Sequence, residues 1–473
     1  MIKDEEWPVA RLIPISSASG VEAQEARLAS ALLAVMAAVP DFGQALLRPL
    51  GAPSGRIRTF TEVPFKLGGT RTIRPDGVIV VTRAGKDWRA LVEAKVAANQ
   101  LDVDQMNAYL DLARELEYQA VLSISNQYVT SSTDYPIEID RRRLRRITLH
   151  HWSWIDLLTE ATVQKDYRGV GDPDQAYILG ELIRYLSDPR SGAVAFEGMG
   201  SGWTTVRDGA RDQTLRKTDE AVMSTVARWD DLVRYLALSL TTELGRQVRH
   251  ALSAAERTSV GRRLALVDSL VSAGRLYADL QIPNVAGVLS ISADLRSRQV
   301  IASTSVDAPR EGTSKGRVSW LLRQLQAAPG NLKVEARVTW KPTSLASPLS
   351  VVQENPSVLY PEKGREIRNF TLSLASNMGT KRDSGRGSFA ESVMNITRTF
   401  YGEVLEKLRG WKAPPPKLKR PAEKEESRQE AVAELVRVEP EHIAEVDETA
   451  VRVEAPGDVQ EDAERPVRDS TQT

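Results

Sequence analysis

The chain has 473 residues, and its 63 Lys and Arg residues balance 63 Asp and Glu residues, so the formal net charge is zero. This balance, together with 41% hydrophobic residues, is typical of a globular protein and excludes a wholly electrostatic nucleic-acid binder. Cysteine is absent and only four histidines are present, which excludes disulfides and thiolate nucleophiles. Any metal should therefore be a hard cation bound by oxygen.

The first predicted element is a helix over residues 20–39. Ser19 and Glu22 have the spacing of a capping box at its start, and Pro40 predicts its end. Its longest apolar stretch, residues 28–39, is too short to span a bilayer, and no apolar targeting segment precedes it. We therefore expect a cytoplasmic protein without membrane contact.

A β-rich stretch at residues 56–65 follows, and then two strands that a turn at Ala84-Gly85 joins into a hairpin. Asp102 and Gln105 form a second capping box, which opens another helix. The resulting order, αβββαββα, predicts an α/β fold with a mixed sheet. The two hairpin strands cover residues 73–82 and 88–96, the helix covers 102–116, further strands cover 118–124 and 145–150, and Ser153 opens the last helix.

The composition of the chain predicts three parts. These are an α/β domain at residues 1–200, an α+β domain at 215–412 and a tail at 413–473. A Gly-rich stretch around 198–209 predicts the linker between the first two parts. The tail has no aromatic residue and a net charge of −7, so we expect it to be disordered and the rest to carry +7. In the second part we predict a long helical stretch at 219–280, strands at 285–293, 299–304, 332–340 and 367–376, and a final helix at 388–411.

Three charged residues of the hairpin carry the functional hypothesis. If the hairpin is symmetric about Ala84-Gly85, Asp76 faces Glu93 with Cβ atoms ~4.5–5.5 Å apart, and two such carboxylates repel unless a cation lies between them. Lys95 projects from the same face as Glu93. Two hard oxygen ligands beside an ammonium favour Mg²⁺-assisted hydrolysis. The structural alternatives are a turn role for Asp76 and a surface ion pair of Glu93 with Lys95.

Arg74-Pro75-Asp76 followed by Glu93-Ala94-Lys95 resembles the PD-(D/E)xK nuclease superfamily, and the resemblance covers about residues 20–160. The restriction-endonuclease-like core of that family has the order αβββαβ, which is also the order predicted above. Gln105 and Tyr109 resemble the QxxxY element of its exonuclease-like branch. The resemblance implies metal-dependent hydrolysis of phosphodiester bonds in nucleic acid, DNA before RNA, with Mg²⁺ or Mn²⁺ held by Asp76 and Glu93.

The resemblance also implies an acidic residue from the first helix. Glu25 is our choice, because Glu22 is explained by the capping box, and Glu62 is a weaker third candidate. We leave open that Gln105 completes a capping box, that Tyr109 is a core residue and that Glu25 lies on a solvated helix face. The predicted catalytic residues are Asp76, Glu93, Lys95 and Glu25, and Gln105 and Tyr109 are predicted to position the nucleic-acid strand.

Basic residues predict where nucleic acid is contacted. Arg141, Arg142 and Arg143 begin a run of five arginines within residues 141–146, which favours phosphate contacts or, as the alternative, a solvated loop. In the second part, basic residues predict contact with either nucleic acid or a protein partner. They form two groups. One flanks Trp320 and consists of Arg310, Lys315, Arg317 and Arg323, and the other occupies a Gly/Ser-rich loop and consists of Lys381, Arg382 and Arg386.

A final cluster, His150-His151-Trp152-Ser153-Trp154, lies at a strand-to-helix junction. Adjacent histidines on a strand point to opposite faces, which disfavours a shared metal. Two alternatives to a nuclease remain open. One is a catalytically inactive nuclease fold that binds nucleic acid. The other is a stress- or defence-associated protein whose second part recognises a protein partner.

Overall fold

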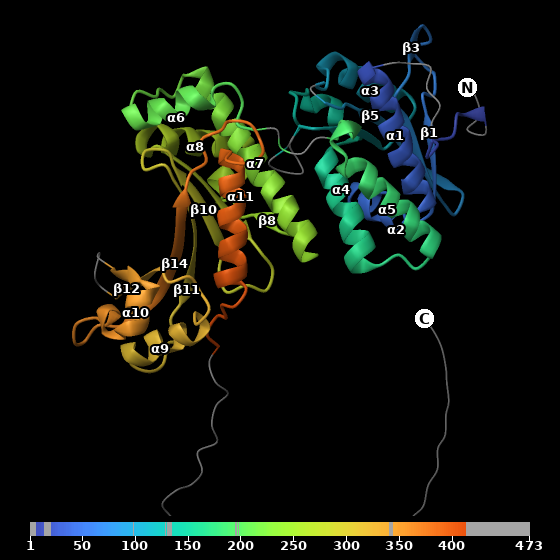
Figure 1. Ribbon diagram of the computed structural model, residues 1–473. Coiled ribbons are helices and arrows are strands. Elements are labelled where there is room, and N and C mark those ends of the chain that lie inside the picture. The colour runs from blue at the N-terminus through green and yellow to red at the C-terminus, as the bar shows by residue number, and fades with distance from the viewer. Residues whose placement is uncertain are drawn as a thin grey trace, which may run out of the picture. The chain divides into compact units, whose positions relative to one another are not determined.

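The computed structural model describes residues 6–13, 20–97, 99–127, 129, 135–193, 196, 198–339 and 344–412. Its contacts divide the chain into two units, Met1–Ala413 and Pro414–Thr473. The tail predicted to be disordered lies outside the described residues. The described part is a mixed α/β structure that contains two large sheets (Figure 1).

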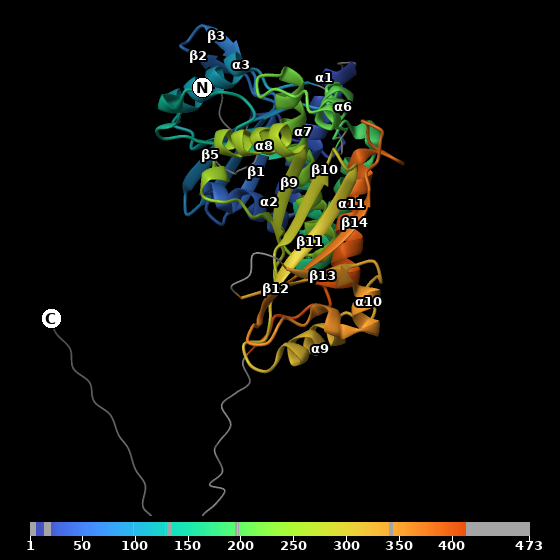
Figure 2. The same cartoon turned by 90° about the vertical axis from the view of Figure 1, so that its left-hand side faces the viewer.

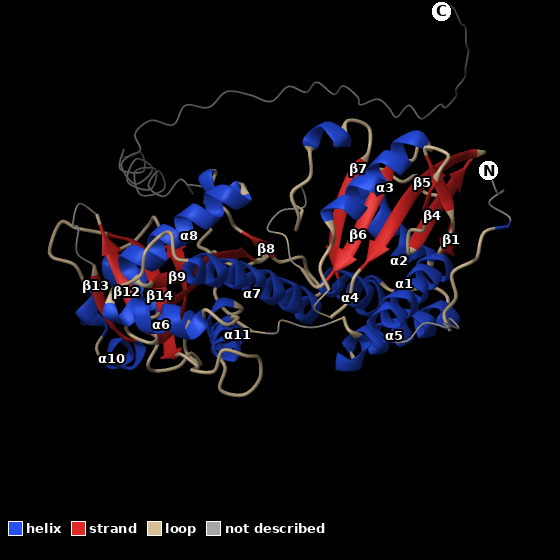
Figure 3. Ribbon diagram, turned by 90° about the horizontal axis from the view of Figure 1, so that it is seen from above, coloured by secondary structure: helices blue, strands red, loops and turns tan. Residues whose placement is uncertain are grey.

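The first large sheet has five strands in the order β1-β4-β5-β6-β7. β1, β4 and β5 are antiparallel neighbours, whereas β5, β6 and β7 run parallel, so the sheet is mixed as predicted. Helix α3 (Val103–Glu115) connects β5 to β6. Figure 3 shows the strands together: β1 (Arg56–Thr61), β4 (Gly77–Arg83), β5 (Lys86–Ala94), β6 (Ala120–Ser125) and β7 (Thr148–Ser153).

Both faces of this sheet are buried. Ala90, Val92 and Ala94 of β5 join a core with four helices, whereas Leu91 joins a core with α3 on the other face. Burial on both faces explains the nearly continuous apolar sequence of the central strands. The four helices of the first core are α1 (Gly20–Ala38), α2 (Pro40–Leu47), α4 (Trp154–Val163) and α5 (Pro173–Ser187).

Proline bounds two of the predicted elements. The first helix ends at Ala38, as the position of Pro40 predicted, and Pro40 itself begins α2, because its missing N–H costs little at the first helical position. The strand predicted at 73–82 is divided at Arg74-Pro75-Asp76. Its first part, β3 (Arg71–Ile73), pairs with β2 (Phe65–Leu67) in a separate two-stranded ribbon.

The second large sheet has seven antiparallel strands in the order β13-β12-β14-β11-β10-β9-β8. Buried residues alternate with half-exposed ones along its strands, so one face packs against helices and the other is partly open. Its strands are β8 (Arg249–His250), β9 (Arg275–Gln281), β10 (Leu289–Asp294), β11 (Gln299–Asp307), β12 (Lys333–Val338), β13 (Leu345–Pro348) and β14 (Ile367–Asn377).

The helices of this part are α6 (Trp203–Asp212), α7 (Glu220–Leu244), α8 (Ser259–Ala273), α9 (Ser314–Gln324), α10 (Leu349–Glu354) and α11 (Phe389–Phe400). The continuous helical stretch predicted at 219–280 is wrong. Gly245, at φ +62°, ends α7 in the left-handed conformation that glycine adopts readily, and β8, α8 and β9 follow. Gly209, predicted in the linker, lies inside α6, whose Trp203, Val206 and Ala210 form a buried helical stripe.

Among the described residues, no single helix is both long and apolar enough to cross a membrane. Residues 20–38 and 40–50 pass the same test of length and composition only together, as a pair bent by 107°. In the structure the apolar side chains of this pair belong to the core beneath the first sheet.

Candidate active site

The site lies at the open end of the β4–β5 hairpin, and the predicted register of this hairpin is confirmed. Arg83 pairs with Lys86 next to the turn, and Gly77 pairs with Val92 at the other end. Asp76 and Glu93 extend this register by one residue beyond the last regular pair. There the Asp76 carboxylate accepts a hydrogen bond from the Ala94 N–H, with Oδ2 2.7 Å from the nitrogen.

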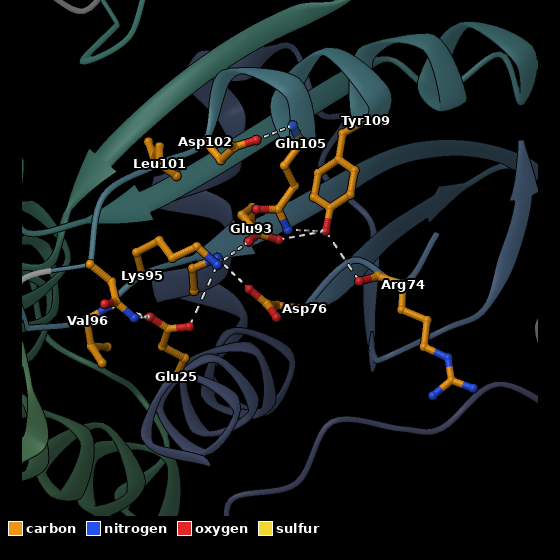
Figure 4. A network of polar contacts seen from close by, with 12 residues as sticks. Glu25, Arg74, Asp76, Glu93, Lys95, Val96, Leu101, Asp102, Gln105 and Tyr109 are labelled. Atoms are coloured by element: carbon orange, nitrogen blue, oxygen red, sulfur yellow. Dashed lines mark hydrogen bonds and ion pairs between the residues drawn. The ribbon is translucent and has the colours of Figure 1, made fainter. Parts of the chain in front are cut away.

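Lys95 joins two carboxylates of the site. Its Nζ lies 2.5 Å from Glu93 Oε1 and 3.7 Å from Glu25 Oε2. Its backbone is fixed by the Ile124 carbonyl, which accepts from the Lys95 N–H at 2.7 Å, and by Trp154, whose indole Nε1–H donates to the Lys95 carbonyl at 2.8 Å. Figure 4 shows the ammonium lying among the side chains of Asp76, Glu93 and Glu25.

Glu25 enters the site from α1 and is only 6% exposed. Its Oε1 accepts hydrogen bonds from the Val96 N–H at 3.2 Å and from Asn99 Nδ2 at 2.8 Å. The two other acids considered for this role, Glu22 and Glu62, are exposed. Asn99 was not predicted, because it lies in a loop and belongs to no motif.

The close approach of α1 to the hairpin depends on Gly77. A Cβ at this position would lie 2.4 Å from Leu33 Cδ1 of α1 and 3.3 Å from Val92 Cβ. Leu33 is fully buried, so an added methyl group would displace its side chain or the helix. The absence of a side chain at Gly77 thus sets the distance between the hairpin and the helix that carries Glu25.

Gln105 and Tyr109 lie on α3 and point toward Glu93. The Tyr109 hydroxyl donates to Glu93 Oε2 at 2.7 Å and accepts from Gln105 Nε2 at 3.2 Å. Asp102 caps α3 as predicted, but the Gln105 side chain bonds to Tyr109 and so does not complete a capping box. Tyr109 is 2% exposed, so its ring is not available to stack on a ligand in this structure, and its hydroxyl holds Glu93.

The electrostatics of the site show a deficit of positive charge. Burial, reinforced by the neighbouring Glu93, raises the pKa of Asp76 to about 8. Burial opposes the charge of Lys95, but Glu93, Asp76 and Glu25 outweigh it and raise the pKa of the ammonium above its ordinary value. Burial and Glu93 also raise the pKa of Tyr109, so this phenol remains a hydrogen-bond donor at neutral pH.

The donor set has the chemistry that Mg²⁺ or Mn²⁺ requires. Asp76 Oδ1 has no hydrogen-bond partner within the described part of the chain, and the repulsion between Asp76 and Glu93 is the kind that a divalent cation relieves. Mg²⁺ commonly uses one or two carboxylates and completes its shell with water and substrate phosphate. Over the described ranges, no three Asp, Glu, His or Cys residues form a preformed metal cage. The Lys95 ammonium already binds Glu93 Oε1, which is one of the proposed metal ligands. A cation would therefore compete with this ammonium.

A polar row continues from Glu93 across the parallel strands to Ser123 and His151. His151 Nδ1 lies 2.9 Å from Ser123 Oγ, and His151 Nε2 lies 3.0 Å from the carbonyl oxygen of Gln127. Burial lowers the pKa of His151 to about 4, so the ring is neutral, and the Gln127 carbonyl assigns its proton to Nε2. His150 lies on the other face beside Trp152, which confirms that the two histidines do not converge.

The first predicted basic run lies toward the C-terminal end of α3. Arg143 forms an ion pair with Asp111, in which Nη1 lies 2.5 Å from Oδ2. Asp111 follows Gln105 by six residues on α3, which is ~9 Å along the helix axis. Arg142 is exposed, and the Arg141 side chain lies outside the described residues.

Arg317 is not available for the predicted contact with nucleic acid or a partner. It is 4% exposed, and its guanidinium donates to the carbonyls of Ile367 and Arg310 and to Glu366. A buried guanidinium with these acceptors stabilises the packing of α9 on the sheet. The remaining basic residues of the two groups are exposed, namely Arg310, Lys315, Arg323, Lys381, Arg382 and Arg386.

Comparison of the chain with models of protein families, with curated proteins and with solved structures finds no match. The resemblance to PD-(D/E)xK nucleases therefore depends on the residues and geometry described above.

A pH dependence of stability follows from Asp76 in metal-free protein. Its folded-state pKa of about 8 exceeds the ordinary value of 3.8, so the folded protein binds an extra proton between these values. The stability that this group contributes is complete below about pH 4 and is lost as the pH rises toward 8. We expect the melting temperature in EDTA, relative to that of Asp76→Asn, to fall between pH 5 and pH 8.5. Parallel melting curves for the two proteins would contradict this prediction, and Glu22→Gln, at an exposed acid, is the control.

Proposed function

We propose that the chain hydrolyses phosphodiester bonds in nucleic acid, DNA before RNA, with a divalent cation at the Asp76–Glu93 site. The observation that carries the proposal is the convergence of Asp76, Glu93 and Glu25 around the Lys95 ammonium at the end of one hairpin. The element order and the mixed sheet further support a restriction-endonuclease-like core for the first sheet and its helices.

In this proposal Asp76 and Glu93 hold the cation. When bound, Mg²⁺ or Mn²⁺ supplies charge next to a phosphate oxygen and lowers the pKa of a coordinated water. Lys95 remains protonated, so it donates hydrogen bonds and does not act as a base. Its ammonium orients the attacking water or neutralises the charge that develops on the phosphate oxygens.

The surrounding residues are assigned as positioning residues. Glu25, held by Val96 and Asn99, keeps the Lys95 ammonium on the side of the carboxylates. Tyr109 and Gln105 fix the rotamer of Glu93 through a chain of two hydrogen bonds. Such preorganisation lowers the cost of bringing the charged groups into a reactive arrangement.

The proposal is tested with the purified chain and labelled single-stranded DNA, double-stranded DNA and RNA, each in linear and circular form. We expect cleavage of DNA with Mg²⁺ or Mn²⁺ that EDTA abolishes and that Lys95→Ala, purified in the same way, does not perform. Lys86→Ala, at the exposed hairpin turn, should cleave as the wild type does. Failure of the wild type to cut any of these substrates would sink the proposal.

A second candidate is a nucleic-acid-binding protein with an inactive nuclease fold. It is favoured by the ammonium of Lys95 on Glu93 Oε1 and by the lack of a three-residue metal cage among the described residues. Calorimetric titration with Mn²⁺ separates the two candidates. Binding that Asp76→Asn abolishes supports the nuclease, and the absence of such binding supports the inactive fold.

A further inference from the structure

The β2–β3 ribbon, residues 65–74, is a basic structure next to the site that none of the roles above uses. The turn Gly68-Gly69 closes it, with both glycines at positive φ (56° and 75°), and Phe65 pairs with Ile73 at its other end. Phe65 packs edge-on against Trp7 at 5.5 Å between ring centroids, and Ile73 is buried in the core with α3. The apolar side chains therefore anchor the ribbon to the body of the protein.

All charged side chains of the ribbon are positive. Lys66, Arg71 and Arg74 are exposed, and residues 63–75 contain no Asp or Glu. In the part of the chain that the structure describes, none of the three forms an ion pair with a carboxylate. Lys66 donates to Thr72 Oγ1 at 2.7 Å, which orients the ammonium without neutralising it. The ribbon thus presents three unpaired cations.

Both ends of the ribbon are tied to α3, which lies beside it (Figure 2). At the tip, the Gly68 N–H donates to Glu115 Oε2 at 3.0 Å, and at the base the Arg74 carbonyl lies 3.3 Å from the Tyr109 hydroxyl. The Tyr109 hydroxyl donates its proton to Glu93 at the shorter distance of 2.7 Å, so the base of the ribbon lies next to the residue that holds a proposed catalytic carboxylate. The cations consequently have a fixed place relative to the site.

Arg74 lies close to the proposed catalytic carboxylates along the chain. It precedes Asp76 by two residues, which is ~7 Å of extended backbone. Its guanidinium extends away from the carboxylates (Figure 4), so it is placed to contact a part of the DNA backbone outside the site itself.

We propose that the basic ribbon binds the sugar–phosphate backbone of the DNA strand that enters the site. It holds the strand through contacts of Lys66, Arg71 and Arg74 with phosphates. This inference rests on the proposed nuclease function and adds the surface that holds its substrate. Contacts of this kind act mainly through release of counterions, so they are measurable as a dependence of affinity on salt.

The test compares two triple variants with equal loss of charge. Lys66→Ala/Arg71→Ala/Arg74→Ala removes the cations of the ribbon. Arg56→Ala/Arg83→Ala/Lys86→Ala removes three exposed cations from the five-stranded sheet, at the turn end of the β4–β5 hairpin and thus opposite the end that carries the site. Binding of a fluorescent 30-base-pair DNA is measured by anisotropy in EDTA across a series of NaCl concentrations. We expect only the ribbon variant to bind DNA at least about tenfold more weakly at low salt. The slope of log K against log salt should also become less steep by about 2–3 in this variant.

A third variant, Arg71→Lys/Arg74→Lys, keeps the charge and should keep the salt slope, and circular dichroism with thermal melting checks that every variant folds. Equal affinity and slope for the two triple variants would overturn the inference. If the wild type also cleaves DNA with Mg²⁺ or Mn²⁺, only the ribbon inference fails. Loss of binding in the ribbon variant without any cleavage by the wild type supports the ribbon and removes the nuclease, and a wild type that binds no DNA overturns both.

Discussion

Asp76→Asn is expected to lower metal-dependent DNA cleavage by about 10²–10³-fold or more, because it removes one of the two proposed anionic ligands at the reacting phosphate. The substitution is nearly isosteric. The amide oxygen of asparagine can still accept the hydrogen bond that the Ala94 N–H now donates to Asp76. Cleavage is measured under single-turnover conditions with Mg²⁺ and with Mn²⁺.

Loss of activity in this variant should not come from loss of structure. At pH 7.5 in EDTA, Asp76 with its pKa of about 8 is mostly protonated, and asparagine is a neutral side chain of nearly the same shape, so the variant should melt no lower than the wild type. Glu22→Gln changes an exposed acid on α1 and should keep full activity. An Asp76→Asn protein that cuts DNA at nearly the wild-type rate would remove Asp76 from the mechanism.

Lys95→Met is expected to affect cleavage and metal affinity in opposite directions. Cleavage should fall by about 10²–10³-fold, since Lys95 supplies the one ammonium that touches these carboxylates within the described residues. Affinity for Mn²⁺ should rise severalfold, because Lys95 Nζ no longer competes for Glu93 Oε1 at 2.5 Å. Calorimetric titration of both proteins measures this difference independently of activity.

The same variant should also depend on metal for its stability. Without the lysine, the carboxylates have no neutralising cation, and removing one partner of a largely buried ion pair costs up to ~3 kcal/mol. Mn²⁺ at 100 times its Kd should restore about 2.7 kcal/mol. Lys86→Met, at the exposed turn, is the control. A Lys95→Met protein that binds Mn²⁺ no better and melts no lower than the wild type would contradict the proposed competition.

The hairpin register was predictable because a two-residue turn and the period of two along a strand fix which residues face each other. Gln105 and Tyr109 were predicted from the spacing of the QxxxY element, and Glu25 from the family's acidic residue on the first helix, once Glu22 was assigned to the capping box. Asn99 and the contact between Ser123 and His151 were not, because nothing in the local sequence distinguishes these residues from ordinary loop and strand residues.

Long-range contacts account for the larger errors. Arg317 has the appearance of a surface cation in the sequence, but its acceptors, Ile367 and Glu366, lie about fifty residues away in the chain. Gly245 ends α7 within the stretch predicted as helical, and the short strand β8 that follows pairs with β9, about thirty residues further along the chain. Local propensity contains neither kind of information.

The bare backbone at Gly77 has a consequence for how relatives of this chain should be compared. Glu25 reaches Lys95 because α1 packs where a methyl group at position 77 would collide with Leu33. In a homologue with alanine at this position, the Leu33 side chain or the helix would have to shift, although every charged residue of the constellation is retained. A comparison of the acids and lysines alone would therefore miss a difference at the residue next to Asp76.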